Sequence, residues 1–115
     1  MVYYDKVDPA TADYIAVATL AELPNGARKI VEIDGKAIAV FNIAGGLYAI
    51  ADVCSHDDGP VAEGELDDHA IECPRHGARF DVRTGQVLSF PAIVDIPAYP
   101  VKVEGQTVLV GLPPA

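Results

Sequence analysis

Cys54-Ser55-His56 and Cys73-Pro74-Arg75-His76 are the stretches around which this chain is organised, with positions 57–72 between them. Each stretch supplies one cysteine and one histidine. The chain has 2 cysteines and 3 histidines in all, so the two stretches use both thiols and leave one imidazole over. A soft thiolate beside an imidazole suits zinc or an iron–sulfur centre. The sequence therefore predicts a metal centre built from both stretches.

The order of these ligands resembles the Rieske signature, in which Cys-x-His is followed further along the chain by Cys-x-x-His. In a Rieske [2Fe–2S] cluster two histidines replace two cysteines on one of the two irons. The resemblance continues through Gly77-Ala78-Arg79-Phe80-Asp81-Val82-Arg83-Thr84-Gly85. This run is similar to the Rieske ferredoxins that supply electrons to bacterial ring-hydroxylating oxygenases.

The resemblance implies a role for each ligand and a division of the chain. Cys54 and Cys73 would bind the inner iron, and His56 and His76 the outer iron, which takes the electron. Residues 1–115 would form a single Rieske domain. Its basal β-barrel or sandwich would comprise residues 1–52 and 93–115, and residues 53–92 would form an inserted cluster-binding lobe with the two ligand loops at hairpin tips.

The spacing of turn residues independently predicts an all-β fold. Turn signals recur at short intervals, among them Asp34-Gly35, Gly45-Gly46 and Gly105-Gln106, and no segment has a helical period. Many short strands with regular turns are typical of an antiparallel sandwich or barrel. The strands expected are 14–18, 28–33, 36–43, 47–50, 65–66, 70–72, 79–82, 86–88, 98–104 and 107–110, with the last two forming one hairpin.

Composition and charge exclude several classes of function. A chain of 115 residues is one domain by size, and half of its residues are hydrophobic, so a sizeable core is expected. The formal net charge of −9 argues against nucleic acid and anionic membranes as partners and favours docking on a basic protein. The N-terminus lacks the pattern of a signal peptide, and no apolar run is long enough to span a bilayer. We expect a soluble, cytoplasmic monomer with reduced cysteines.

The resemblance also predicts a reduction potential at the low end of the Rieske range, which is roughly −150 to +300 mV. High-potential Rieske proteins carry an additional cysteine in each ligand loop, and Gly59 and Arg75 stand at those positions here. Those proteins also direct a serine and a tyrosine hydroxyl at the cluster sulfurs. Ala78 and Phe80 stand in their places and cannot donate a hydrogen bond, so the reduced state is less stabilised.

Structural zinc is the main alternative, since Cys₂His₂ sites commonly bind it. Zinc fingers usually pair like with like, whereas each loop here mixes one cysteine with one histidine. Oxygen chemistry in this chain is not expected: terminal oxygenases add a second domain with a two-histidine, one-carboxylate iron site, and His69 is the only spare histidine. The chain also lacks a Gly-rich dinucleotide fingerprint, so it would not take hydride from a nicotinamide directly.

The predicted function is therefore a one-electron shuttle, not an enzyme. It would carry electrons from a flavin-containing reductase to a terminal non-haem iron oxygenase. Two alternatives share the same cofactor: the small Rieske subunit of an assimilatory nitrite reductase, and a ferredoxin accessory to iron–sulfur cluster assembly.

Several polar and aromatic residues near the ligands carry weaker expectations. His69 is predicted to be a surface residue, and Asp57-Asp58 an exposed acidic turn. Arg75 lies between two ligands and is a candidate for a partner-docking surface, while Arg79 and Arg83 are expected to pair with Asp81 or other nearby acids. Phe90-Pro91-Ala92 is expected to be either an ordinary turn or, by resemblance, the proline loop that covers the cluster.

Overall fold

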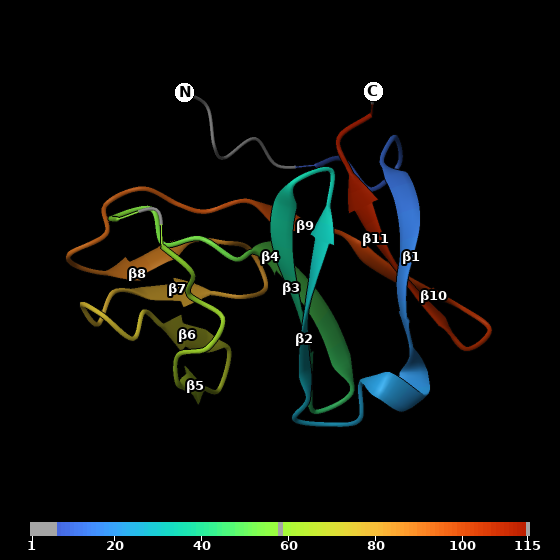
Figure 1. Cartoon of the computed structure of the whole chain (residues 1–115), viewed down its shortest axis with the longest axis horizontal. Helices are drawn as coiled ribbons and strands as arrows, with labels where there is room; N and C mark the ends of the chain where they lie inside the picture. The colour runs from blue at the N-terminus through green and yellow to red at the C-terminus, as the bar shows by residue number, and fades with distance from the viewer. Residues whose placement is uncertain (1–6, 58, 115) are drawn as a thin grey trace.

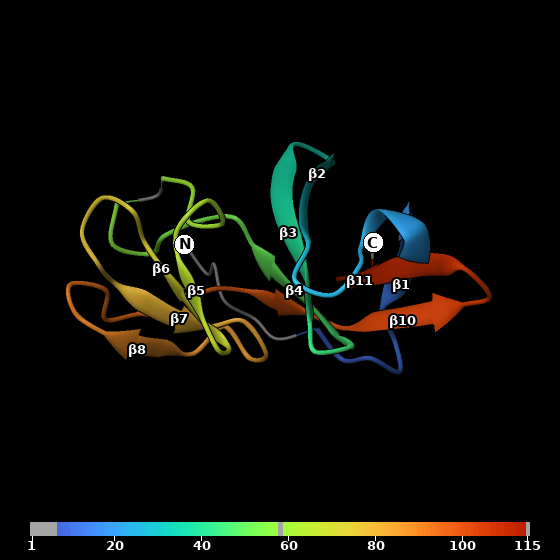
Figure 2. The ribbon, with the colours of Figure 1, turned by 90° about the horizontal axis from the view of Figure 1, so that it is seen from below.

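The computed structural model describes residues 7–57 and 59–114. Its strands form three antiparallel sheets that follow one another along the longest axis of the molecule (Figures 1 and 2). The described residues contain one 3₁₀ helix, η1 (Leu20–Glu22), and no α-helix. No helix in this part of the chain is both long and apolar enough to cross a bilayer. The prediction of an all-β fold is confirmed.

The end sheet has the strand order β1-β11-β10 and contains both the first strand and the last. Its strands are β1 (Asp13–Thr19), β10 (Val101–Glu104) and β11 (Thr107–Leu112). The hairpin of β10 and β11 turns at Gly105, whose φ of 63° favours a glycine. This confirms the expected turn at Gly105-Gln106.

The middle sheet has the order β2-β3-β4-β9. Its strands are β2 (Arg28–Ile33), β3 (Lys36–Ile43), β4 (Gly46–Ala51) and β9 (Ala98–Tyr99). The turn between β2 and β3 is Asp34-Gly35, and both residues have positive φ, at 52° and 77°. This is the backbone that a two-residue hairpin loop requires, and it explains why the sequence marks this turn so clearly.

The third sheet, which we call the loop sheet because it precedes and follows the second ligand stretch, has the order β5-β6-β7-β8. Its strands are β5 (Leu66–Asp67), β6 (Ala70–Glu72), β7 (Arg79–Asp81) and β8 (Val87–Ser89). Gly64 allows the chain to enter this sheet, because a Cβ there would lie 1.6 Å from the Glu72 carbonyl oxygen.

The predicted last hairpin is wrong in one respect. Residues 98–104 do not form one strand, because Pro100 separates β9 from β10 and has no backbone N–H to donate. The two pieces then pair with different sheets: β9 pairs with β4, whereas β10 pairs with β11. The short β9 thereby becomes an edge strand of the middle sheet. All three sheets are open, so the basal part is sandwich-like and not a closed barrel.

Strand β3 is buried on both faces and connects two hydrophobic cores. Ile38 and Val40 pack with the end sheet, around Val108 and Val110, whereas Ala39 and Phe41 contribute to the core of the loop sheet. Successive side chains of a strand point to opposite faces, so a strand between two cores is apolar at consecutive positions. The second core also includes both cysteines, and the ligand loops are thus supported by the same packing that holds the sheets together.

Candidate metal centre

The two predicted ligand stretches form two loops that are closed in the same way. The first loop, residues 54–59, follows β4, and the second, residues 73–78, joins β6 to β7. In each, the backbone N–H of the cysteine donates to the carbonyl oxygen five residues later: Cys54 to Gly59 and Cys73 to Ala78, both at 2.7 Å. Each cysteine is thus fixed at the base of its loop and the histidine lies towards the tip.

Hydrogen bonds from Asp52 and Arg28 hold the segment that follows the first loop. Asp52 Oδ1 accepts the backbone N–H groups of Val61 at 2.8 Å and Ala62 at 2.7 Å. Arg28, on β2 of the middle sheet, donates through Nη1 to the carbonyl oxygens of Ala62 at 2.6 Å and Gly64 at 2.8 Å. The segment behind the first loop is therefore held by both a carboxylate and a guanidinium.

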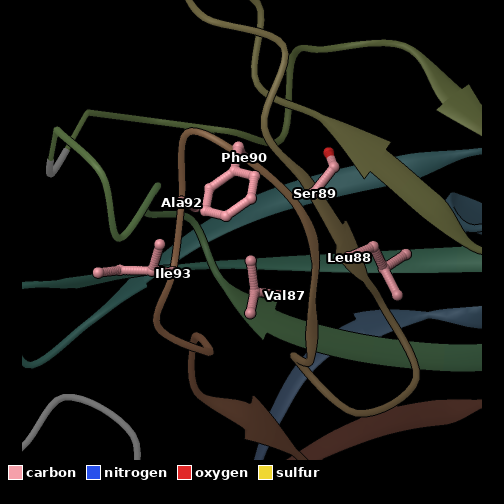
Figure 3. Close-up of a pocket in the computed structure, with 6 residues that line it drawn as sticks. All are labelled: Val87, Leu88, Ser89, Phe90, Ala92 and Ile93. Carbon is pink, nitrogen blue, oxygen red and sulfur yellow. The ribbon is translucent and has the colours of Figure 1, made fainter.

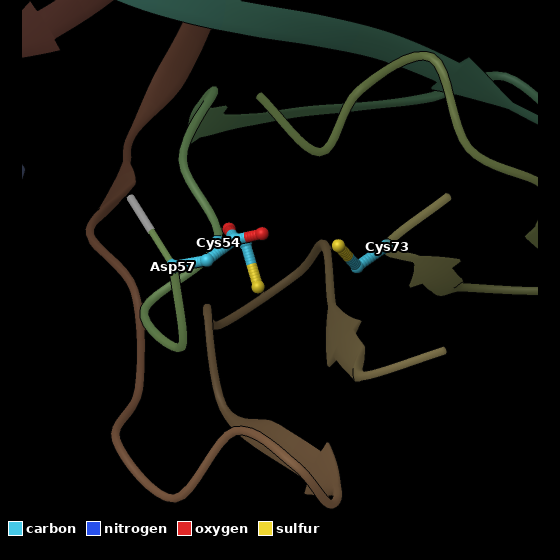
Figure 4. Close-up of side chains that lie close together, drawn as sticks. All are labelled: Cys54, Asp57 and Cys73. Atoms are coloured by element: carbon cyan, nitrogen blue, oxygen red, sulfur yellow. The ribbon is translucent and has the colours of Figure 1, made fainter. Parts of the chain in front are cut away.

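The two thiols are buried and converge from separate loops. Cys54 and Cys73 are 0% and 1% exposed, and neither forms a disulfide. Their Sγ atoms and a carboxylate oxygen of Asp57 all lie within 4.8 Å of one another (Figure 4). Burial raises the pKa of the Cys54 thiol, while the backbone N–H groups of His56 and Asp57 act in the opposite direction. Such N–H groups suit a thiolate whose charge a metal neutralises.

The two imidazoles lie together on the exposed side of the thiols. The ring centroids of His56 and His76 are 4.9 Å apart and the rings are nearly perpendicular. One nitrogen of each ring and a carboxylate oxygen of Asp57 also lie within 4.8 Å of one another. Both histidines are exposed to solvent. The structure thus brings all four predicted ligands into one region, with sulfur inside and nitrogen outside.

This donor set fits the chemistry of a Rieske cluster. Two thiolates can bind one iron from the buried side, and two imidazoles can bind the other from the exposed side. Ala78 and Phe80 are fully buried in the same core as both cysteines and carry no hydroxyl, and the low reduction potential expected from them stays a prediction. The assignment of the four residues as ligands stays a prediction from their pattern and arrangement.

Asp57 and Arg75 form a contact that the sequence did not reveal. Arg75 Nε and Nη2 donate to the two carboxylate oxygens of Asp57 at 2.6 and 2.9 Å, and Nη1 donates to the Pro60 carbonyl oxygen at 2.7 Å. The Arg75 guanidinium, helped by the Gly59 N–H, holds the pKa of the Asp57 carboxyl well below its usual range. The opposite charges were visible in the sequence, but their pairing across 18 positions was not. Asp58 lies outside the described residues.

The remaining polar predictions have mixed outcomes. Both arginines pair with nearby acids, as expected: Arg83 with Asp81 at 2.9 Å, and Arg79 with Glu72 at 3.1 Å. His69, expected at the surface, is only partly exposed: its side chain is 22% exposed and its ring packs edge-on to Tyr48. A histidine in a short polar turn gives no sequence signal for such packing.

An exposed apolar surface lies next to the first ligand loop. Phe90 and Ile93 are 80% and 74% exposed, and they line an open pocket of about 370 Å³ with Val87, Leu88 and Ala92 (Figure 3). The Ser55 hydroxyl donates to the Val94 carbonyl oxygen, which ties this segment to the first loop. The segment begins at a cis Phe90–Pro91 peptide bond. We call Leu88, Phe90, Ile93 and Val94 the apolar rim.

Comparison with known proteins adds an independent observation. Residues 13–100 match the family described as Rieske [2Fe-2S] domain. The ferredoxin component of a naphthalene 1,2-dioxygenase system from Pseudomonas aeruginosa is 39% identical over 102 residues, which cover 89% of this chain and 98% of that protein. The ferredoxin of carbazole 1,9a-dioxygenase from Nocardioides aromaticivorans IC177 superimposes with a TM-score of 0.79 at 36% identity, covering 84% of this chain and 95% of its own.

A second similar structure contains a partner. It is a complex of reduced oxygenase and oxidised ferredoxin in carbazole 1,9a-dioxygenase, in which the matching chain has a TM-score of 0.80 and 32% identity. The match covers 85% of this chain and 92% of that chain. The matched region of this chain includes both ligand loops and all the strands between them. By sequence and by fold, this chain belongs to the Rieske [2Fe-2S] domain family, whose cofactor is a two-iron, two-sulfide cluster.

Proposed function

We propose that this chain is the ferredoxin component of an aromatic-ring dioxygenase system. It carries single electrons from a flavin-containing reductase to a terminal non-haem iron oxygenase and catalyses no reaction on the aromatic substrate. The match covers nearly the whole length of similar proteins that are themselves ferredoxin components, which supports the role of an electron carrier. When bound, the cluster supplies a reversible one-electron couple.

The observation that carries this proposal is the arrangement of the ligand side chains. Cys54 and Cys73 are buried in the core, whereas His56 and His76 are exposed and lie edge-to-face at the surface. A partner protein can therefore approach the imidazole edges without entering the protein. We propose that the two cysteines hold the inner iron and the two histidines the outer iron. Residues 53–92 would then form the cluster-binding lobe, and residues 1–52 and 93–115 the basal part.

The surface around the imidazoles suits a protein partner. The apolar rim exposes aromatic and aliphatic side chains beside the first ligand loop. Contiguous exposed apolar patches often mark protein–protein interaction sites. The net charge of −9 adds long-range attraction to a partner with a basic docking face. The protein would act as a cytoplasmic monomer, since a transient carrier must expose the same face to each partner in turn.

Two measurements test the proposal in sequence. Protein purified without oxygen should contain about two irons and two acid-labile sulfides per chain, and reduction should produce an electron paramagnetic resonance signal. Reduced protein mixed with a terminal ring-hydroxylating oxygenase should then be oxidised with saturable kinetics. A colourless protein that contains zinc would overturn the cofactor assignment. A normal cluster that reduces a sirohaem enzyme or a cluster-assembly scaffold, and not the oxygenase, would reassign the partner.

A further inference from the structure

The two ligand loops are held together by a side-chain contact and not only by their own backbones. Each loop is closed on itself by the hydrogen bond from its cysteine N–H. Arg75 then reaches from the second loop to the first. Its three hydrogen bonds end on Asp57 and on the carbonyl oxygen of Pro60, which lie within and just beyond the first loop. One guanidinium therefore contacts the other loop at two separate points.

The geometry of this contact is restrictive. A guanidinium and a carboxylate that share two parallel hydrogen bonds fix both distance and orientation, unlike a single ion pair between flexible side chains. Gly59 leaves room for it, because a Cβ there would lie 2.6 Å from Arg75 Nη2 and 2.7 Å from Cζ. The Arg75 and Asp57 side chains are 34% and 23% exposed, so the pair is partly shielded from water.

Asp57 also lies beside the predicted ligands themselves. Its Oδ2 is 3.4 Å from His76 Nε2, and its carboxylate is within 4.8 Å of both cysteine sulfurs. The carboxylate that Arg75 grips is thus at the centre of the ligand set and belongs to the loop that carries two of the four ligands. A change in the Arg75–Asp57 contact would move one pair of ligands relative to the other.

We propose that Arg75 and Asp57 form a non-covalent clamp that holds the two ligand loops at the separation required by the cluster. Both are then positioning residues for the cofactor, and Arg75 is not primarily a docking residue. Both cysteines of the chain are free, so the clamp links two loops that no disulfide joins. The proposal rests on the ligand set given under the proposed function.

The test is the lifetime of the bound cluster. Arg75→Gln, Asp57→Asn and the double variant are incubated with an iron chelator, and the visible absorbance of the oxidised protein is followed. Each single variant should lose its cluster on the order of fivefold faster than the parent, and the double variant no faster than Arg75→Gln, because the Asp57 change removes nothing further once the guanidinium is absent. Gly59→Ala, which retains both charges but displaces the guanidinium, should also accelerate the loss.

A matched control is available within the same chain. Arg83 forms a two-point ion pair with Asp81, two residues away in a single turn, so it joins no separate segments. Arg83→Gln should leave the cluster lifetime unchanged. Arg75→Lys should behave like Arg75→Gln, since a lysine retains the charge but cannot make two parallel bonds and a third to Pro60. Line shape in the reduced paramagnetic spectrum should broaden in the clamp variants and not in Arg83→Gln.

The outcomes separate the clamp from its alternatives. If Arg75 serves docking instead, Arg75→Gln should have a native cluster lifetime and slower electron transfer to the oxygenase. Additive effects on the lifetime in the double variant would show that Arg75 and Asp57 act through independent contacts. Either result overturns the clamp. Iron and sulfide content of Cys73→Ser tests the ligand set separately. If Cys73→Ser retains a full cluster, the ligand assignment fails. If it loses the cluster while Arg75→Gln retains it at the native rate, only the clamp fails.

Discussion

The four predicted ligands differ in burial, and that difference gives the centre a direction. The cysteines at positions 54 and 73 are inside the core of the loop sheet, whereas the histidines at 56 and 76 are exposed. A partner that touches this end of the molecule meets imidazole edges first. The same arrangement protects the thiolates from oxidants and exchanging metals in solution.

Replacing either thiol tests the assignment of the ligands. Cys54→Ser and Cys73→Ser should retain less than about a tenth of the native iron, because a buried hydroxyl is a poor substitute for a thiolate and metal binding is coupled to folding. Iron and sulfide analysis of freshly purified protein measures this. Ser55→Ala changes a side chain in the same loop that is not a predicted ligand, and it should retain the cluster. Full iron content in both cysteine variants would contradict the assignment.

A second residue-scale prediction concerns the reduction potential. Ala78 is fully buried, and its carbonyl oxygen accepts the Cys73 N–H. Ala78→Ser would place a hydroxyl donor beside the second ligand loop, and a neutral hydrogen bond to sulfur favours the reduced state. A bond of about 1 kcal/mol corresponds to roughly 40 mV for one electron. A redox titration should therefore show an upward shift of that size.

The control for this change is Ala49→Ser, which introduces the same hydroxyl at an equally buried position in the other core. It should lower the free energy of unfolding but leave the reduction potential unchanged. A downward shift in Ala78→Ser, or equal shifts in both variants, would contradict the assignment of the potential to sulfur hydrogen bonding.

At the residue scale, the predictable part of the site is the part encoded by local spacing. Two cysteines and two histidines in short motifs can be recognised as candidate metal ligands from the sequence alone. The contact between Asp57 and Arg75 does not, because it depends on how two loops 18 positions apart approach each other. His69 is similar, since its packing on Tyr48 is set by the fold of the loop sheet and not by its neighbours in sequence.

At the element scale, hairpins were predictable where both partners and the turn are adjacent in sequence. The Asp34-Gly35 turn and its two strands follow the expected bounds. The segment 98–104 was misread as one strand because its alternation is continuous across Pro100. Only the fold shows that β9 completes the middle sheet while β10 completes the end sheet. A pairing decided between distant segments leaves no local pattern.

Gly64 provides a prediction at this scale, because it controls the entry to the loop sheet. Its Cβ position lies 1.6 Å from the Glu72 carbonyl oxygen, so Gly64→Ala must push the backbone before β5 away from β6. Overpacking against a fixed backbone atom costs about 1–3 kcal/mol. Denaturant unfolding should show a loss of that order, and the cluster should bleach earlier than in the parent.

Gly105→Ala is the comparison for Gly64→Ala. Its Cβ would meet nothing within 4 Å, but its φ of 63° makes an alanine moderately strained. It should lose about 1 kcal/mol or slightly more in stability with no change in cluster lifetime, since the β10–β11 turn is in the end sheet. Equal effects of the two substitutions on the cluster would show that the close approach at Gly64 is not what supports the ligand loops.

At the scale of the whole molecule, the three sheets place the ligand loops at one end and leave the other end without predicted ligands. The end sheet and the ligand loops lie at opposite ends of a molecule 40 Å in its longest dimension (Figure 1). The middle sheet connects them through a strand that is buried on both faces. Composition could predict a core but not that there are two, because both are filled from alternate residues of the same strand.

The position of the ligand loops at one end of the molecule leads to a prediction about docking. Phe90 and Ile93 are the most exposed large hydrophobic residues of the described chain, and they lie on the segment tied to the first ligand loop through Ser55. If the oxygenase docks on this end, Phe90→Glu or Ile93→Glu should reduce the second-order rate of electron transfer about tenfold, because apolar anchors near the centre of an interface carry much of its binding energy. Rapid-mixing kinetics measure the rate, and the spectrum and potential should be native.

Val103→Glu makes the same change in charge at a 42% exposed position on β10, in the end sheet, and should leave the rate nearly unchanged. Equal slowing by Val103→Glu would assign the effect to net charge, and a native rate in both rim variants would place the docking face elsewhere.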